Sequence, residues 1–497
     1  MNALLLAAAL LAAAPEPELR WGADAQGGAP YVFQDPTDPN HLVGFEVELA
    51  GELGRKLGVR ARPIQGPWDK LIELLARGDF DIALNGIEVA DEKTRVVLLS
   101  RPYFSAPERL TIRNGDARAP RTMDALKGRP VGTLPGSMAE RILTRAGAEV
   151  RTYEGGQDQI YADLKLGRID AVLLDAPIAL FYAEIDPDFQ TVPGDFGSVE
   201  YAIAFRLDDE PRRAKVNAAL EALIHDGTLR ALYEKWGLWS PEIAQLFGDP
   251  DPIARSSPEE FLRWRAAVGK LPPFWERVTT RYPQVLPLFF KGALLSIAVS
   301  LLAMMLAIVL GISLAMGRRY GPKPVSLACV MYIEFFRGTP LLIQLTMIYF
   351  GLPELGLKLS PFIAGVVALG LNYAAAEAEN YRAGLESVPV GQLEAATVLG
   401  FSRLQSLRFI VAPQAVRIAI PPMTNDFIAL LKDSSLVSIV TLTELTKTYT
   451  TLASSMRDHL GLGLLVAVVY LLIGLPFAQL ARAVERRFGR HLKRESA

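Results

Sequence analysis

Apolar and polar positions are distributed unevenly along this chain of 497 residues. Residues 15–285 mix charged positions with short apolar runs, whereas 292–316 and 460–481 contain no charged residue at all. About 20 consecutive apolar residues are enough to cross the hydrocarbon layer of a bilayer as a helix. The pattern therefore predicts a soluble part followed by a membrane-spanning part.

Within the soluble part, short runs typical of strands alternate with helical patterns. The successive segments are 19–24, 44–58, 59–64, 67–78 and 80–86, followed by a second cycle that begins at 129–137 and includes 169–175. Repeated β–α alternation predicts mostly parallel sheets covered by helices, and two cycles predict an α/β fold of two lobes. Ligands of such folds bind where the carboxyl ends of strands face a crevice.

The membrane-spanning part is predicted to be all-α, with about five transmembrane helices. The expected spans are 292–316, 325–350, 359–376, 411–431 and 460–481. Basic residues gather in the loops that five spans place on one side, at 317–323, 382–408 and 482–494. The positive-inside rule makes that side the cytoplasm. An odd number of spans then puts the soluble part outside the cell membrane.

The composition argues against several classes of function. The net charge of −2 gives no basis for nucleic-acid binding. Cys329 is the only cysteine, which excludes internal disulfides and argues against a metal site. The sequence contains no G-x-x-x-x-G-K-[ST] loop, so ATP hydrolysis is expected on another subunit. Residues 1–14 form a short apolar run that resembles a signal peptide, although no basic residue precedes it.

Candidate ligand-binding residues lie where predicted strands end. An amino-acid ligand needs a cation for its carboxylate, a carboxylate for its ammonium, and backbone donors at a helix N-terminus. The residues that offer these groups, or apolar walls for a pocket, are Asp24, Tyr31, Phe33, Trp68, Gly86, Glu88, Lys93, Arg95, Ser137 and Asp175. Other roles stay open, because Asp175 could cap a helix, the two basic residues could be solvated and the aromatics could be core.

A longer motif lies between the third and fourth expected spans. Residues 391–413 contain Glu394-Ala395-Ala396, then Gly400, and later Ile410 and Pro413. Small alanines let a short helix sit closely in a groove of a partner, and a glycine lets the chain turn afterwards. The motif resembles the EAA loop of ABC importer permeases, which implies that these residues couple the permease to its ATPase.

The soluble part resembles the type II periplasmic binding proteins of polar amino acid importers. The matching stretches include GFEVELAGELGRKLG (44–58), WDKLIELLARGDFDIALNG (68–86) and LGRIDAVLLDAP (166–177). The resemblance implies ligand contacts at Asp24, Glu88, Lys93, Ser137 and Asp175. Lys93 stands where the family has an arginine, and Lys cannot form the bidentate fork of Arg. Glu88 stands where a small or hydroxyl residue is usual, so it either favours a cationic ligand or neutralises Lys93 or Arg95.

Both resemblances together imply a polar amino acid ABC importer, with a binding protein fused to a permease of the His/Glu/Gln/Arg type. The expected parts are a signal peptide (1–14), an extracytoplasmic binding domain (15–240), a linker with an interfacial helix (241–286) and a permease (287–497). The chain is expected to be a transporter subunit of the inner membrane without catalytic residues or a metal. Its expected partners are an ATP-binding cassette ATPase that holds ATP and Mg, a second permease in a homodimer or heterodimer, and a free amino acid. The alternatives are a membrane sensor with a binding fold and a ligand-gated channel.

Overall fold

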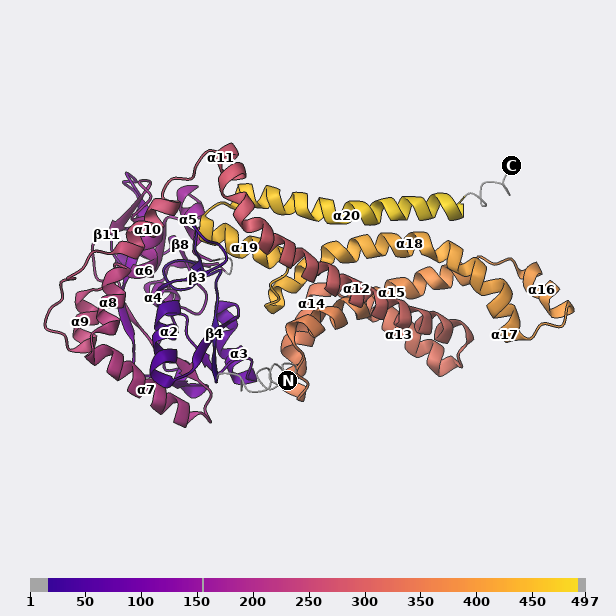
Figure 1. Ribbon diagram of the computed structural model, residues 1–497, viewed down its shortest axis with the longest axis horizontal. Coiled ribbons are helices and arrows are strands. Elements are labelled where there is room, and N and C mark those ends of the chain that lie inside the picture. Colours follow the sequence, from indigo (N-terminus) through magenta and orange to yellow (C-terminus); the bar gives the residue numbers. More distant parts are fainter. Residues whose placement is uncertain (1–16, 154–155, 490–497) are drawn as a thin grey trace, which may run out of the picture. The chain divides into compact units, whose positions relative to one another are not determined.

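The computed structural model describes residues 17–153 and 156–489, so the predicted signal peptide and the last part of the basic tail lie outside it. The chain forms two compact units (Figure 1). The front unit comprises the described residues up to Val285 together with Thr450–His459. The helical unit comprises Leu286–Tyr449 and the residues from Leu460 onward.

Two β-sheets define two lobes in the front unit. The sheet of the first lobe has the order β4 (Arg60–Gln65), β1 (Glu18–Ala23), β5 (Ile82–Ala83), β13 (Ala204–Phe205), β6 (Leu98–Leu99). The sheet of the second lobe has the order β11 (Phe189–Val192), β7 (Phe104–Arg113), β10 (Ala171–Asp175), β8 (Pro130–Thr133), β9 (Glu149–Thr152), and β12 (Ser198–Tyr201) also pairs with β7. Strands β4, β1 and β5 are parallel, as are β10, β8 and β9, while β7 and β13 run antiparallel to their neighbours. The predicted two-lobed α/β fold is confirmed, with antiparallel strands where the chain crosses between the lobes.

Helices cover both sheets. They are α2 (Phe45–Leu57), η1 (Trp68–Lys70), α3 (Leu71–Arg77), η2 (Lys93–Arg95), η3 (Asp124–Leu126), α4 (Met138–Ala146), α5 (Gln157–Lys165), α6 (Ala176–Ile178), η4 (Ala179–Ala183), α7 (Glu210–His225) and α8 (Thr228–Lys235); a two-stranded hairpin joins β2 (Phe33–Gln34) to β3 (Leu42–Val43). Helix α2 begins after Gly44, where φ is 135° and a Cβ would lie 1.9 Å from the Tyr31 carbonyl oxygen, so only glycine fits. It ends at Gly58 in the left-handed conformation.

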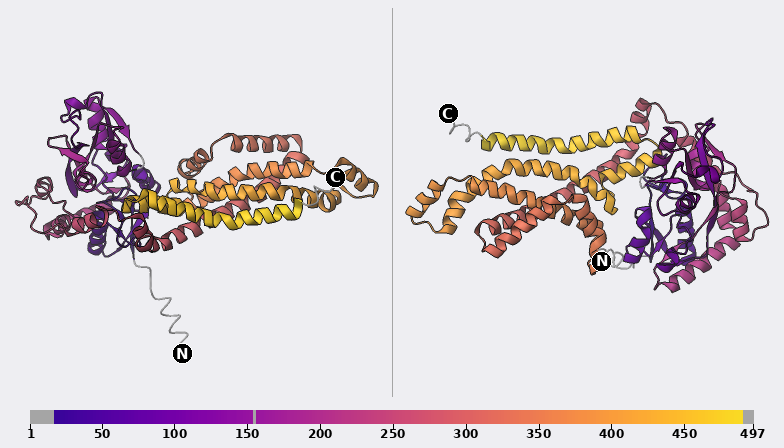
Figure 2. Two further views of the ribbon diagram at one scale, coloured as in Figure 1. Left: turned by 90° about the horizontal axis from the view of Figure 1, so that it is seen from above. Right: turned by 180° about the vertical axis from the view of Figure 1, so that it is seen from behind.

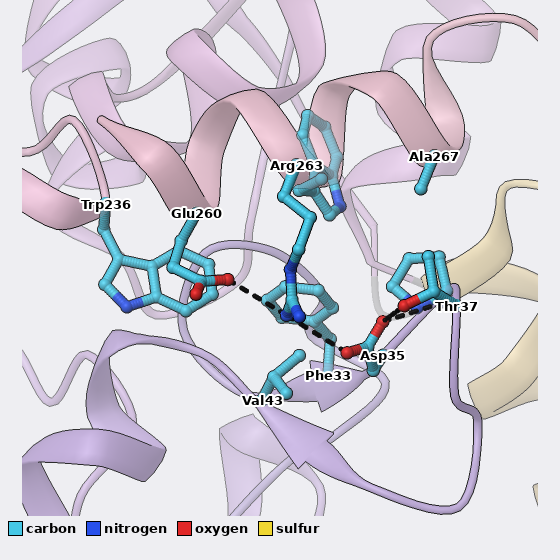
Figure 3. A pocket seen from close by; sticks show the side chains of 10 residues that line it. Phe33, Asp35, Thr37, Val43, Trp236, Glu260, Arg263 and Ala267 are labelled. Carbon is cyan, nitrogen blue, oxygen red and sulfur yellow. Dashed lines mark hydrogen bonds and ion pairs between the residues drawn. The ribbon is translucent and has the colours of Figure 1, made fainter. Parts of the chain in front are cut away.

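The connector continues the front unit as helices α9 (Pro241–Phe247), α10 (Glu259–Val268) and α11 (Phe274–Thr280). Trp264 and Val268 of α10 are buried in the same core as the aromatic residues of both lobes. The Trp264 ring lies 4.7 Å from that of Phe181, centroid to centroid. Figure 3 shows Arg263 between Glu260 and Asp35, at 2.9 and 3.1 Å, beside a small cavity. The first connector helices thus pack as part of the front unit.

The helical unit consists of long helices with short interruptions. The elements are α12 (Tyr282–Tyr320), α13 (Lys323–Gly338), α14 (Leu341–Thr346), η5 (Met347–Gly351), η6 (Leu352–Leu355), α15 (Pro361–Glu386), α16 (Val390–Val398), α17 (Arg403–Ser406), η7 (Leu407–Val411), α18 (Ala412–Asp433), η8 (Ser434–Val440), α19 (Leu445–Met456) and α20 (His459–Gly489). Helix α15 packs along α18 and against α13. Figures 1 and 2 show α16 and α17 together at one end of this unit.

Three of these helices are long and apolar enough to cross a membrane, namely α12, α15 and the part of α20 up to Ala483. A fourth candidate is the pair Lys323–Gly338 and Leu341–Leu355, which bends by 105° at the break between them. The predicted span at 411–431 is a helix, α18, but it is not among these candidates, because its prolines and charged residues lower its mean hydropathy. The predicted multi-helix membrane part is therefore confirmed, and the exact number of five spans stays a prediction.

Candidate functional site

The site between the two lobes begins with Asp24, which directly follows β1. Its carboxylate accepts hydrogen bonds from the Gln26 N–H at 2.9 Å, the Gln65 side-chain amide at 2.7 Å and the Trp68 N–H at 3.2 Å. The Asp24 N–H donates to Asn85 Oδ1 at 2.7 Å. Asp24 therefore holds together three loops at the carboxyl ends of the first sheet, where the Trp68 Nε1–H also donates to the Asn85 carbonyl at 2.8 Å.

Glu46 lies beneath this loop cluster and was not anticipated from the sequence. It accepts from the Gly86 N–H at 2.7 Å, the Asn85 side chain at 3.2 Å and the Tyr103 hydroxyl at 2.5 Å. Burial raises the pKa of Glu46 to about 7, against the opposing effect of these hydrogen bonds. Its sequence signal is weak: residue 46 falls on the buried stripe of α2, where a carboxylate needs polar partners.

Asp175 ends β10 of the second lobe and joins it to the first. Its carboxylate accepts from the Tyr31 hydroxyl at 2.8 Å and from the Tyr201 hydroxyl, and the two hydroxyls lie 2.9 Å apart. It also accepts from the Ile178 N–H at 3.1 Å and so caps α6. Burial raises the pKa of Asp175, while the hydrogen bonds from Tyr201 and Tyr31 oppose that shift. The capping role considered from the sequence is thus present together with a contact across the lobes.

Glu88 forms the second contact between the lobes, with Arg141 as a partner that was not anticipated from the sequence. Arg141 of α4 donates to buried Glu88 at 3.0 Å and to exposed Glu92 at 2.8 Å. The Lys93 ammonium lies 5.6 Å from the centroid of the Trp68 ring. Burial lowers the pKa of Lys93, and the charge of Glu88 opposes this shift. The spacing of Arg141 four residues after Ser137 was the available signal, since both lie in the first turns of one helix.

Ser137 caps α4 at the side of the second lobe. Its hydroxyl accepts from the Glu140 N–H at 3.1 Å and donates to the Leu134 carbonyl at 2.7 Å. Glu108 of β7, opposite Asp175 in the sheet register, is buried and its Oε2 has no hydrogen-bond partner within the described chain. Burial, then the charges of Asp175 and Glu88, raise its pKa well above the ordinary value. Arg95, in contrast, is exposed at the end of η2.

The structure therefore gathers most of the expected ligand residues. Tyr31 and Asp175 are in contact, Trp68 and Lys93 are in contact, and Glu88 lies close to Lys93 and to the first turn of α4. This arrangement offers carboxylates, cations and the N–H groups of a helix terminus within one region between two lobes. It can recognise a small ligand that carries charges of both signs.

The EAA segment forms α16 and the turn that follows. Ala396 is buried, whereas Val398 and Leu399 are 87% and 75% exposed. Gly400 has a φ of +80°, and an added Cβ would meet no atom within 4 Å. A capping box at Ser402 then starts α17. The turn thus presents apolar side chains outward beyond a glycine in the left-handed conformation.

Both halves of the chain match known protein families. Residues 19–238 match the family model of bacterial extracellular solute-binding proteins, family 3, and residues 307–490 match the binding-protein-dependent transport system inner membrane component. The L-cystine-binding protein TcyJ of Escherichia coli K12 is 35% identical over 210 residues, which are 42% of this chain and 78% of that protein. The glutamine transport system permease protein GlnP of the same strain is 33% identical over 204 residues, or 41% of this chain and 93% of that protein.

Among solved structures, an ancestral arginine-binding protein bound to arginine matches with a TM-score of 0.41 and 32% identity, over 44% of this chain and 97% of that chain. The two family models together cover most of the chain and leave out only its termini and residues 239–306. This chain therefore belongs to the binding-protein-dependent ABC importers, and it carries their extracellular solute-binding component and their inner membrane component in one polypeptide.

Proposed function

We propose that the front unit binds one free polar amino acid between its lobes and delivers it to the permease helices of the same chain. Asp175 receives the ammonium group, and Lys93 together with the first turn of α4 after Ser137 receives the carboxylate. Tyr31, Trp68 and Gly86 line the cleft, and Asp24 fixes the loops that carry Trp68 and Gly86. Relatives named for glutamine and L-cystine support an amino acid as the cargo.

One observation carries this proposal. Asp175 of the second lobe is held by Tyr31 of the first, so a cation bound at this carboxylate contacts both lobes at once. A ligand that bridges two lobes stabilises their closed arrangement, because only that arrangement offers all of its contacts. Closure then becomes the signal that a permease can use.

The domain limits follow the same division. We propose a signal peptide at 1–14, a binding domain at 15–240, a connector at 241–286 and a permease domain at 287–497, with the binding domain outside the inner membrane. The permease works as a homodimer or heterodimer, and a separate ATPase subunit holds ATP and Mg.

The contact that couples the permease to this ATPase is formed by Glu394, Ala395, Ala396 and Gly400. The exposed Val398 and Leu399 support this role, because apolar side chains that project from a loop favour a protein partner.

Isothermal titration of the purified full chain in nanodiscs against the twenty amino acids tests the ligand assignment. We expect at least one polar amino acid to bind. Asp175→Asn weakens that binding about 100-fold, because the ligand ammonium then lies buried without a countercharge. Asp170→Asn is the matched control, since Asp170 lies on the same lobe and pairs with Arg129 at the surface. If no amino acid binds to the wild-type chain, the proposed cargo is wrong.

A further inference from the structure

The carboxylate of Glu88 occupies an unusual position between the lobes. Glu88 follows β5 of the first lobe and its backbone pairs with Tyr201. Its side chain is only 7% exposed, and Arg141 of the second lobe donates to it at 3.0 Å. A buried carboxylate is expensive to keep unless cations or N–H groups surround it. The neighbours of Glu88 are therefore the groups that can stabilise an anion in this region.

Two further groups act on the same carboxylate. Burial raises the pKa of Glu88, while the charge of Lys93 and then the backbone N–H of Met138, the first residue of α4, oppose that shift. Helix α4 has nine residues and begins at the Ser137 cap, so its first N–H groups carry the partial positive charge of a helix terminus. A cation and a helix N-terminus are the same groups that the proposed function assigns to the carboxylate of the ligand.

We infer that Glu88 is a specificity-determining residue that occupies the carboxylate subsite of the cleft as a built-in competitor. The inference rests on the proposed function, which places the ligand carboxylate at Lys93 and α4. A ligand with a free carboxylate must compete with Glu88 for the positive charge of Lys93 and of the start of α4. A ligand without that negative charge does not. Glu88 thus weakens the binding of amino acids and reduces the preference of the cleft for their carboxylate.

The surroundings of Arg141 allow this exchange. Arg141 also donates to Glu92 at 2.8 Å, and the Glu92 side chain is 65% exposed. When Glu88 moves or is replaced, Arg141 keeps a counterion at the surface instead of remaining as an unpaired buried charge. Replacement of Glu88 by threonine, which retains a hydroxyl, is therefore expected to leave the fold intact.

The test compares two ligands on the full chain in nanodiscs. One is the tightest-binding amino acid from the titration, and the other is its carboxamide, which lacks the negative charge. We expect Glu88→Thr to tighten binding of the amino acid about tenfold or more and to change binding of the carboxamide less than twofold. Glu92→Gln is the matched control, because it contacts the same Arg141 from the surface, and it is expected to change neither value more than twofold.

If the dissociation constants of the two ligands changed equally, Glu88 would act only on the distance between the lobes. That result would overturn the inference while leaving amino acid binding in place. An unchanged amino acid affinity in Glu88→Thr would overturn it as well. If neither chain binds any amino acid, the proposed function fails, and the inference that rests on it fails as well.

Discussion

The front unit and the helical unit differ in the exposure of their proposed functional groups. In the front unit, the carboxylates of Glu46, Glu88 and Asp175 are withdrawn from bulk water and accept hydrogen bonds from a backbone N–H group, an arginine and a tyrosine, respectively. In the helical unit, the EAA segment leaves the apolar Val398 and Leu399 exposed. Polar groups that are already satisfied need a ligand only to exchange partners, whereas exposed apolar groups need a partner surface. On the proposed function, the first site is complete within the chain and the second is completed by another subunit.

The largest effect expected in the helical unit tests the exposed turn at Gly400. Gly400→Val places a β-branched residue at a φ of +80°, which L-residues with a branched Cβ strongly avoid. The turn after α16 must then rearrange, so we expect ligand-stimulated ATP hydrolysis by the reconstituted transporter to fall at least about tenfold. Amino acid binding by the same chain is expected to stay unchanged, because Gly400 lies outside the front unit.

Gly391→Ala is the control for that experiment. Gly391 lies in α16 of the same segment, has open space around its Cβ position and has a backbone conformation that alanine accepts. We expect its stimulated ATPase rate to remain within twofold of wild type. Stimulation that survived in Gly400→Val would remove this turn from the coupling contact.

The two units also differ in how much the sequence revealed. Strand and helix periods predicted the two-lobed fold, and uncharged runs predicted the membrane helices, because both patterns are local. The EAA loop was recognisable because its residues lie within 391–413. Asp175 and Glu88 were found at strand ends, but their actual partners Tyr201 and Arg141 were not. Glu88 and Arg141 are 53 residues apart and meet across two lobes, so no periodicity in either segment encodes their contact.

An effect of intermediate size is expected in the front unit, from the titration of Glu46. The pKa of Glu46 is raised from its ordinary value of 4.5 to about 7. Since the folded state binds the proton more tightly, the stabilisation is fully present below pH 4.5 and is lost as the pH rises through 7. A shift of this size corresponds to about 3 kcal/mol at most. We expect the melting temperature of the front unit to fall by roughly 5–10 °C between pH 5 and pH 8.

Glu46→Gln isolates this contribution. The amide oxygen still accepts from the Gly86 N–H, but the side chain no longer titrates, so the dependence on pH is expected to flatten over the same interval. Glu73→Gln serves as the control, because Glu73 is exposed in α3 and pairs with Lys70 at the surface. Differential scanning fluorimetry of each full chain gives the melting temperatures. A Glu46→Gln profile as steep as that of wild type would assign the titration to another group.

The smallest expected effect is that of Arg95→Ala, which is compared with Lys93→Ala in the same short helix, η2. Lys93 is partly buried, lies against the Trp68 ring and is the strongest attractive charge on Glu88, whereas Arg95 is exposed. A charge in water is screened and contributes little to a buried contact, while a charge near low-dielectric surroundings contributes more. We therefore expect Arg95→Ala to change the amino acid dissociation constant less than twofold, and Lys93→Ala to raise it about tenfold. Calorimetric titration of both variants measures the contrast. A larger loss in Arg95→Ala than in Lys93→Ala would mean that Arg95 turns into the cleft when ligand binds, and would transfer the carboxylate contact from Lys93 to Arg95.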